Sequence, residues 1–169
     1  MKTLIIYDSV FGNTGKIAQN IYNSFKNKDE VKICHIDYAE LRDLENIDLL
    51  IIGSPTRGFR PTELISKFIK GITSYGLIGI KTAVFDTRLC LSEINSSLFR
   101  FIVKNGGYAA STIDHLLQKK GGKSIVTSEG FLVNGEKGPL KEGELERASS
   151  WLNKILISYT NQLQTNSIL

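Results

Sequence analysis

The sequence predicts a doubly wound α/β fold, in which a five-stranded parallel sheet carries helices on both faces. Short apolar runs alternate with segments whose apolar residues recur every three or four positions. The chain of 169 residues has the length of one domain, and it contains no internal repeat and no Ser/Pro-rich linker. Right-handed crossovers between parallel strands then place helices on both sides of the sheet.

Each predicted strand is a short, mostly apolar run, as expected for strands that are covered on both faces. The runs are residues 4–7, 31–36, 47–52, 81–85 and 124–128. The run 47–52 is the most hydrophobic, so we expect it near the middle of the sheet. The fifth strand ends at residue 128 or, if it continues, includes residues 131–133.

The predicted helices each bury one apolar stripe. They cover residues 15–26, 39–44, 62–73, 91–107, 109–120 and 144–159. The clearest stripes are Leu64, Ile65, Phe68, Ile69 and Ile72 in the third helix and Leu145, Ala148, Leu152, Ile155 and Leu156 in the last. Together these elements form one domain over residues 1–160, followed by a polar tail at 161–169 that we expect to fray.

Composition disfavours several functional classes. The apolar runs are too short to cross a bilayer and no signal-peptide pattern is present, so we expect a cytoplasmic protein that does not insert into membranes. The net charge is +4, but the lysines are dispersed and not grouped with aromatic residues, so we expect no nucleic-acid binding. Cys34 and Cys90 match no disulfide, metal or redox motif. His35 and His115 are isolated in the sequence.

The residues that follow the first strand, Ser9-Val10-Phe11-Gly12-Asn13-Thr14, form the clearest candidate site. A loop that rises from a strand and opens a helix exposes free backbone N–H groups, which can bind a phosphate. Ser9, Asn13 and Thr14 add side-chain donors. The alternative interpretation is an ordinary turn in which Asn13 or Thr14 caps the helix.

Two well-known phosphate motifs are absent from this loop. A nucleoside-triphosphate loop needs a glycine where Val10 stands and a Ser or Thr where Ile17 stands. The dinucleotide motif G-x-G-x-x-G is also missing. We therefore predict a seat for a single terminal phosphate. Loops at residues 8–14, 54–59 and 86–89 should meet at the carboxyl edge of the sheet, where doubly wound folds bind ligands.

This first loop, the following Ile17-Ala18 and the loop Gly53-Ser54-Pro55-Thr56-Arg57-Gly58 together resemble flavodoxins and flavodoxin-like proteins. The resemblance covers nearly the whole chain in element order. It implies a flavodoxin-like fold and non-covalent FMN, with the phosphate on the first loop and the ring between the other two. The cofactor-binding residues that it implies are Ser9, Val10, Phe11, Gly12, Asn13, Thr14, Pro55, Thr56, Arg57, Gly58, Phe59, Asp86, Thr87 and Arg88.

The resemblance also implies how the ring loops tune the cofactor. Gly58 matches the position of a peptide that flips and accepts a hydrogen bond from the reduced flavin, although a glycine that only turns the loop would look the same. Flavodoxins usually place Trp or Tyr against the ring, whereas these loops offer Arg57 and Arg88, with only Phe59 nearby. We therefore expect a less negative potential for the hydroquinone. Flavodoxins are also typically acidic, whereas this chain has a net charge of +4, so we expect a redox partner protein with an acidic docking surface.

Three functions remain open from the sequence. The favoured one is an electron carrier that cycles FMN between oxidised, semiquinone and hydroquinone states, because no catalytic set of side chains is recognisable. The second is an FMN-dependent NAD(P)H:quinone or flavin reductase on the same fold. The third is a flavodoxin-like binding module without cofactor. We expect no catalytic or metal-binding residue, and the oligomeric state is left open.

Overall fold

A parallel sheet with the strand order β2-β1-β3-β4-β5 lies at the centre of the molecule. The computed structural model describes residues 1–90 and 107–166. The strands are β1 (Thr3–Tyr7), β2 (Val31–His35), β3 (Leu49–Pro55), β4 (Lys81–Leu89), β5 (Lys123–Ser124) and β6 (Glu129–Val133). All pairings between these strands are parallel, which confirms the predicted fold class.

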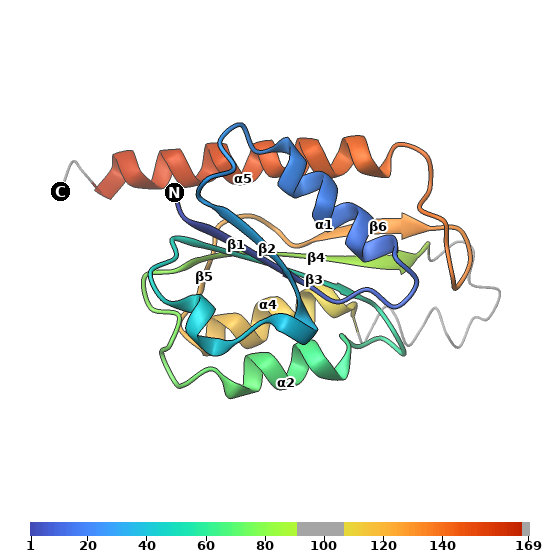
Figure 1. Ribbon diagram of the computed structural model, residues 1–169, viewed down its shortest axis with the longest axis horizontal. Coiled ribbons are helices and arrows are strands. Elements are labelled where there is room, and N and C mark those ends of the chain that lie inside the picture. Colours follow the sequence, from blue (N-terminus) through green and yellow to red (C-terminus); the bar gives the residue numbers. More distant parts are fainter. Residues whose placement is uncertain (91–106, 167–169) are drawn as a thin grey trace.

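Helices cover both faces of this sheet (Figure 1). They are α1 (Asn13–Ser24), α2 (Glu63–Gly71), α4 (Ala109–Lys119) and α5 (Glu144–Asn166). Helices α1 and α5 lie on one side, and α2 and α4 lie on the other. The central strands contribute side chains to a hydrophobic core on each face of the sheet, because successive side chains point to opposite faces. In β1, Ile5 packs with α1 and α5, whereas Leu4 and Ile6 pack with α2 and α4.

The fifth position in the sheet is divided between two short strands. Strand β5 pairs with the beginning of β4, and β6 pairs with its end. Between them the chain leaves the ladder, and the Thr127 carbonyl accepts a hydrogen bond from Trp151 Nε1 at 3.4 Å. The expectation of one continuous strand at 124–128 was therefore wrong: the Ile125 amide still donates to the Thr82 carbonyl of β4, but the Thr127 carbonyl bonds to α5. Residues 131–133, given as a continuation of this strand, do belong to β6.

Strand β4 is longer than its apolar run suggested. Asp86, Thr87 and Arg88 were expected in a loop but belong to the strand, where they pair with Gly130, Phe131 and Leu132 of β6. Their polar side chains end the apolar pattern, yet β6 supplies backbone partners along the whole edge. The strand therefore carries these three residues to the rim of the sheet.

The helices differ from expectation at several points. Residues 39–44 form no α-helix; short 3₁₀ turns occur instead at η1 (Ile36–Tyr38) and η2 (Leu41–Leu44). The expected helix at 91–107 falls almost wholly outside the described residues. Helix α5 continues to Asn166, beyond the predicted end at residue 159.

Two residues assigned to buried stripes face solvent. Leu64 is 46% exposed and Leu145 is 38% exposed, whereas Ile65, Ile69 and Leu152 are fully buried. Each exposed leucine stands in the first turn of its helix, at the margin of the stripe that contacts the sheet. Trp151, which the periodicity did not assign, is buried against Phe85 and Phe131.

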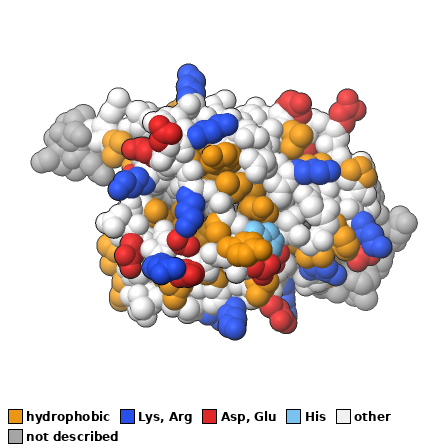
Figure 2. Space-filling view, in the orientation of Figure 1, with side chains coloured by type: hydrophobic (Ala, Val, Ile, Leu, Met, Phe, Trp, Pro, Cys, Tyr) orange, Lys and Arg blue, Asp and Glu red, His pale blue; other side chains and the backbone are white. Residues whose placement is uncertain are grey.

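Charged side chains of both signs are interspersed over the face shown in Figure 2, without one dominant patch. In the described part of the chain, no helix combines the length and apolar character that a membrane crossing requires.

Candidate functional site

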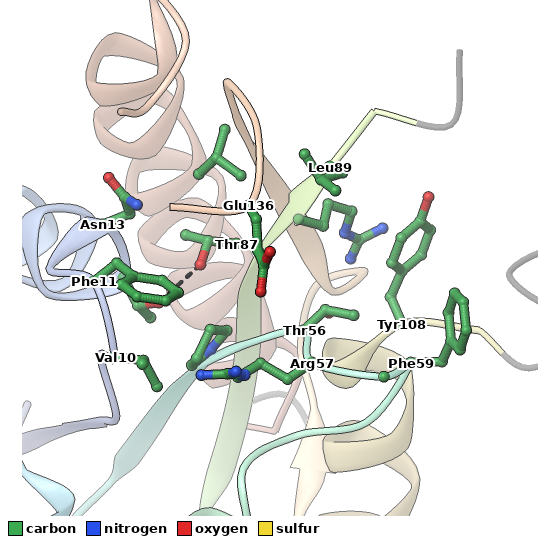
Figure 3. Close-up of a pocket in the computed structure, with 15 residues that line it drawn as sticks. Val10, Phe11, Asn13, Thr56, Arg57, Phe59, Thr87, Leu89, Tyr108 and Glu136 are labelled. Atoms are coloured by element: carbon green, nitrogen blue, oxygen red, sulfur yellow. Dashed lines mark hydrogen bonds between the residues drawn. The ribbon is translucent and has the colours of Figure 1, made fainter. Parts of the chain in front are cut away.

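A cavity of about 570 Å³ opens at the carboxyl end of β1, β3 and β4 (Figure 3). Its volume lies within the usual range for ligand and cofactor sites. The position follows from topology, since the connections from β1 and β3 leave in opposite directions at this point and the loops separate. The cavity is lined by Val10, Phe11, Asn13, Thr14, Pro55, Thr56, Arg57, Gly58, Phe59, Thr87, Arg88, Leu89, Tyr108, Val133 and Glu136.

One end of the cavity is formed by the beginning of α1. Gly12 precedes the helix with a φ of 82°, a left-handed conformation that suits glycine. The amides of Gly15 and Lys16 are bonded to Ser9 Oγ and the Gly12 carbonyl, at 2.9 and 3.0 Å. The amides of Asn13 and Thr14 precede the first intrahelical bond and have no acceptor within the helix. This end therefore presents backbone donors and the positive end of the helix dipole to an anion.

The side chains at this end already form hydrogen bonds within the protein, but they still have hydrogens to donate to a ligand. Thr14 Oγ1 and Thr87 Oγ1 lie 2.8 Å apart, and one of these two hydroxyl protons remains after their mutual hydrogen bond. Ser9 Oγ accepts from Gly15, so its own proton is free to be donated. Asn13 uses one amide hydrogen on the Lys137 carbonyl and has a second. These donors fit the acceptor-only oxygens of a phosphate.

A hairpin at residues 133–140 forms another wall of the cavity. Val133 and Leu140 form an antiparallel bridge. Asn13 Nδ2 donates to the Lys137 carbonyl at 3.0 Å, and Gly138 lies so close that a Cβ there would stand 2.3 Å from Asn13 Nδ2. The Glu136 side chain points into the cavity (Figure 3). A glycine at position 138 permits this close approach, because it has no side chain.

A tight turn at Arg57–Arg60 forms part of the opposite end. The amide of each of these arginines donates to the carbonyl of the other at 3.0 Å. The central residues Gly58 and Phe59 have φ values of 52° and 67°, the signs of a type I′ turn. Gly58 adopts this conformation readily, whereas Phe59 is strained in it. The Arg57 guanidinium lies 5.6 Å from the centroid of the Phe11 ring, which links this turn to the phosphate end.

Arg88 and Tyr108 form the wall beside this turn. The guanidinium carbon of Arg88 lies 3.7 Å from the Tyr108 ring centroid, and Arg88 Nε donates to Asp86 Oδ1. Burial raises the pKa of the Asp86 carboxyl, and the hydrogen bond and charge of Arg88 oppose this rise. Burial likewise raises the pKa of Tyr108. The pairing with Asp86 offsets much of the positive charge that Arg88 brings to the cavity.

The structure brings most of the predicted residues to one cavity. Those that line it are Val10, Phe11, Asn13, Thr14, Pro55, Thr56, Arg57, Gly58, Phe59, Thr87 and Arg88. Ser9, Gly12 and Asp86 are not part of the lining, and of these three Asp86 is fully buried whereas Gly12 is exposed.

Tyr108, Val133 and Glu136 line the cavity but were missed, and Leu89 was expected only as the end of the 86–89 loop, not as a binding residue. Tyr108 corrects the expectation that Phe59 is the only aromatic residue near the ring loops. A signal for it existed, because a helix that follows a parallel strand begins at the carboxyl edge, and Tyr108 directly precedes such a helix.

The histidine and cysteine residues do not form a metal centre in the described ranges 1–90 and 107–166. His35 is nevertheless not isolated in space. Its Nδ1 lies 3.2 Å from Asp37 Oδ2, and its Nε2 lies 3.6 Å from Asp8 Oδ1. His35 therefore stands between two carboxylates beside the phosphate end, outside the cavity lining.

Comparison with known proteins gives a consistent result. A family model described as Flavodoxin matches residues 5–151. A flavodoxin of Maridesulfovibrio salexigens is 33% identical over 89 residues, which cover 50% of this chain and 61% of that protein. The flavodoxin-like domain-containing protein BilS of Clostridioides difficile is 38% identical over 55 residues, 31% of this chain and 30% of its own. Both alignments thus span less than two thirds of the relative.

Solved structures share the fold over almost the whole chain. A flavodoxin from the domain Archaea has a TM-score of 0.71 at 19% identity and covers 95% of this chain and 98% of its own. Flavodoxin 2 of Bacillus cereus has a TM-score of 0.70 at 23% identity, with coverage of 96% and 99%.

Proposed function

Because the chain belongs to the flavodoxin family, whose cofactor is FMN, we propose that it is an electron carrier that binds FMN non-covalently and passes electrons to a partner protein. One observation carries this proposal. A single cavity of about 570 Å³ joins a cup of backbone amides and hydroxyls to a cleft walled by Arg57, Arg88 and Tyr108. These two ends match the two chemically different halves of a flavin mononucleotide.

The phosphate end would hold the terminal phosphate without a lysine. The amides of Asn13 and Thr14 and the remaining hydroxyl protons of Ser9, Thr14 or Thr87 would supply the hydrogen-bond donors. The Asn13–Lys137 hydrogen bond fixes the hairpin against this cup. Charge-assisted hydrogen bonds from fixed amides bind a dianion strongly, so this end would supply much of the affinity.

The other end would hold the ring and set its electrostatic environment. FMN, when bound, supplies one- and two-electron redox chemistry, and the protein contributes binding and charge. In the described structure Arg57 forms no ion pair, whereas Arg88 is paired with Asp86. Arg57 is therefore the cation that would favour the reduced, anionic cofactor and raise its potential. The φ of 52° at Gly58 supports the proposal that this turn needs glycine there, whether or not its peptide flips.

The redox partner is proposed to present an acidic surface, because the exposed Arg57 and Arg60 stand at this end of the molecule. A cytoplasmic location likewise stays a proposal from the sequence.

The purified protein, reconstituted with FMN and compared with riboflavin, tests the proposal. We expect stoichiometric uptake of FMN, a visible flavin spectrum, and only slow bleaching by NADPH in the absence of another protein. Rapid bleaching by NADPH would instead establish a reductase on the same fold. A chain that takes up no FMN at all would be a cofactor-free module, and the proposal would be wrong.

A further inference from the structure

We propose that Asp86 is a positioning residue for the ring end of the FMN site, although it does not reach the cavity. This inference rests on the proposed function, since it concerns how tightly the flavin is held. Asp86 lies in β4 and is fully buried. Its two carboxylate oxygens bond to three different segments of the chain, and each of these segments contributes a wall of the cavity.

The first pair of contacts joins the β3–α2 loop to α4. Asp86 Oδ2 accepts a hydrogen bond from Thr56 Oγ1 at 3.0 Å and another from the Ala110 amide at 2.9 Å. Thr56 Oγ1 in turn accepts from the Ala109 amide at 3.0 Å. The proton of Thr56 is therefore committed to Asp86, and the hydroxyl oxygen to the helix. The loop that begins at Thr56 is thus fixed to the first turn of α4.

This arrangement satisfies the first two amides of α4, which have no acceptor within the helix. A negative charge near a helix N-terminus also interacts favourably with the helix dipole. Tyr108 directly precedes Ala109, so the position of its ring depends on where this turn is held. Asp86 consequently determines the location of an aromatic wall that it does not touch.

The third contact fixes Arg88. Asp86 Oδ1 accepts from Arg88 Nε, while the guanidinium lies over the Tyr108 ring. On another side Arg88 packs against Gly130, where an added Cβ would stand 2.3 Å from Arg88 Cζ. Asp86, Gly130 and Tyr108 therefore hold the guanidinium between β4, β6 and α4.

Another buried carboxylate offers a matched comparison. Glu144 is also buried, and it accepts hydrogen bonds from a backbone amide, that of Leu132, and from an arginine, Arg147. It stands at the beginning of α5 and does not line the cavity. Its glutamine variant keeps an oxygen for the Leu132 amide. E144Q thus removes a buried charge whose hydrogen-bond partners, Leu132 and Arg147, do not line the cavity.

Comparing FMN with riboflavin shows whether a substitution acts at the ring end or at the phosphate end of the site. Riboflavin lacks the phosphate, so a change at the ring end alters the affinities for riboflavin and FMN by the same factor. For D86N we expect both dissociation constants to rise about tenfold or more, because three walls lose a common charged acceptor. The ratio of the two constants should stay unchanged. E144Q should lower the melting temperature and leave both affinities as in the wild type.

The experiment titrates the apoprotein with each flavin and follows the quenching of flavin fluorescence. Thr56→Val and Thr56→Ser form a second pair, which decides the question if D86N does not fold. T56V removes both hydrogen bonds of the hydroxyl and should weaken both flavins in parallel, whereas T56S keeps the hydroxyl and should restore binding.

The outcomes separate this inference from the proposed function. If the wild type binds FMN but D86N binds both flavins equally well, Asp86 has no positioning role. A loss of affinity for FMN but not for riboflavin would likewise overturn the inference. Equal flavin affinities in T56V and T56S would also overturn it. If the wild type binds neither flavin, the proposed function fails first, and that failure is visible before any variant is made.

Discussion

The guanidinium carbon of Arg88 lies 3.7 Å from the centroid of the Tyr108 ring. Arg88 is near the end of β4 and Tyr108 directly precedes α4, so this contact joins two elements at the rim of the sheet. A cation over an aromatic face is stabilised by about 0.5–2 kcal/mol, depending on solvent exposure. Because the two side chains are in contact and both line the cavity, they form one continuous part of its wall.

Replacing the Tyr108 ring should weaken flavin binding. Y108L removes the face that Arg88 covers, so we expect a severalfold increase in the dissociation constants of FMN and riboflavin and a lower melting temperature. Y108F keeps the ring and serves as the control, with affinities near those of the wild type. Flavin fluorescence titration measures both. Equal affinities in Y108L and the wild type would show that the ring contributes nothing.

Gly138 should matter more than Gly135, although both have positive φ. Alanine at either position incurs backbone strain of about 1–2 kcal/mol. Only at Gly138 would the new Cβ also collide with the Asn13 side chain. We therefore expect G138A to weaken FMN binding and G135A to lower only the thermal stability. The same FMN affinity in the two variants would contradict the role of the hairpin.

The Thr14 hydroxyl should contribute to binding of the FMN phosphate and not to binding of the ring. T14V keeps the shape of the side chain but removes the partner of Thr87 and one donor, so we expect FMN to bind about tenfold more weakly. Riboflavin should bind as before, and T14S should behave like the wild type. Calorimetric titration with each flavin checks this. A parallel loss for riboflavin would mean that Thr14 supports the fold instead.

Arg57 should raise the reduction potential of the bound flavin. R57Q removes a cation that lines the cavity, so we expect the potential to fall by on the order of tens of millivolts, reduced by the solvent exposure of this side chain. Arg60 lies in the same turn but outside the cavity lining, and R60Q is the matched control. Redox titration at fixed pH distinguishes them. An unchanged reduction potential in R57Q would show that Arg57 does not raise the potential of the bound flavin.

Asp43 should contribute stability that is lost in acid. A hydrogen bond from Lys32 and another from the Glu40 amide lower the pKa of Asp43 below its ordinary value of 3.8. The folded protein therefore binds a proton at Asp43 less readily than the unfolded chain. Its contribution is complete above pH 3.8 and disappears as the pH falls through the lowered pKa.

In D43N the free energy of unfolding should consequently depend less steeply on pH in this acidic range. The difference is expected to be below about 1 kcal/mol, because Lys32 is exposed. Urea unfolding at a series of pH values measures it. K32Q should show part of the same flattening, and a D43N slope identical to that of the wild type would exclude this contribution.

The sequence was sufficient for the features that depend on local pattern. Apolar runs such as 49–52 and the helical spacing of Ile17 and Ile21 are properties of neighbouring residues, so they predicted the layers and the position of the site. The phosphate loop was also recognisable, because its strand, loop and helix are continuous in the chain.

Features that depend on tertiary pairing were not recognisable. Asp86 looked like the end of an apolar strand, and only β6 shows that the strand continues past it. The hairpin at 133–140 has no pattern that assigns it to Asn13, a residue that lies far from it in the sequence. Burial of Asp86 among Thr56, Arg88 and Ala110 likewise arises from three separate segments.

The hydrogen bond between Asn13 and the Lys137 carbonyl also bears on how the protein is made. During translation the phosphate loop leaves the ribosome early, but its hairpin partner is among the last parts of the domain to emerge. A nascent chain that ends before Lys137 cannot form this hydrogen bond. The complete phosphate end therefore forms only after synthesis has passed Lys137.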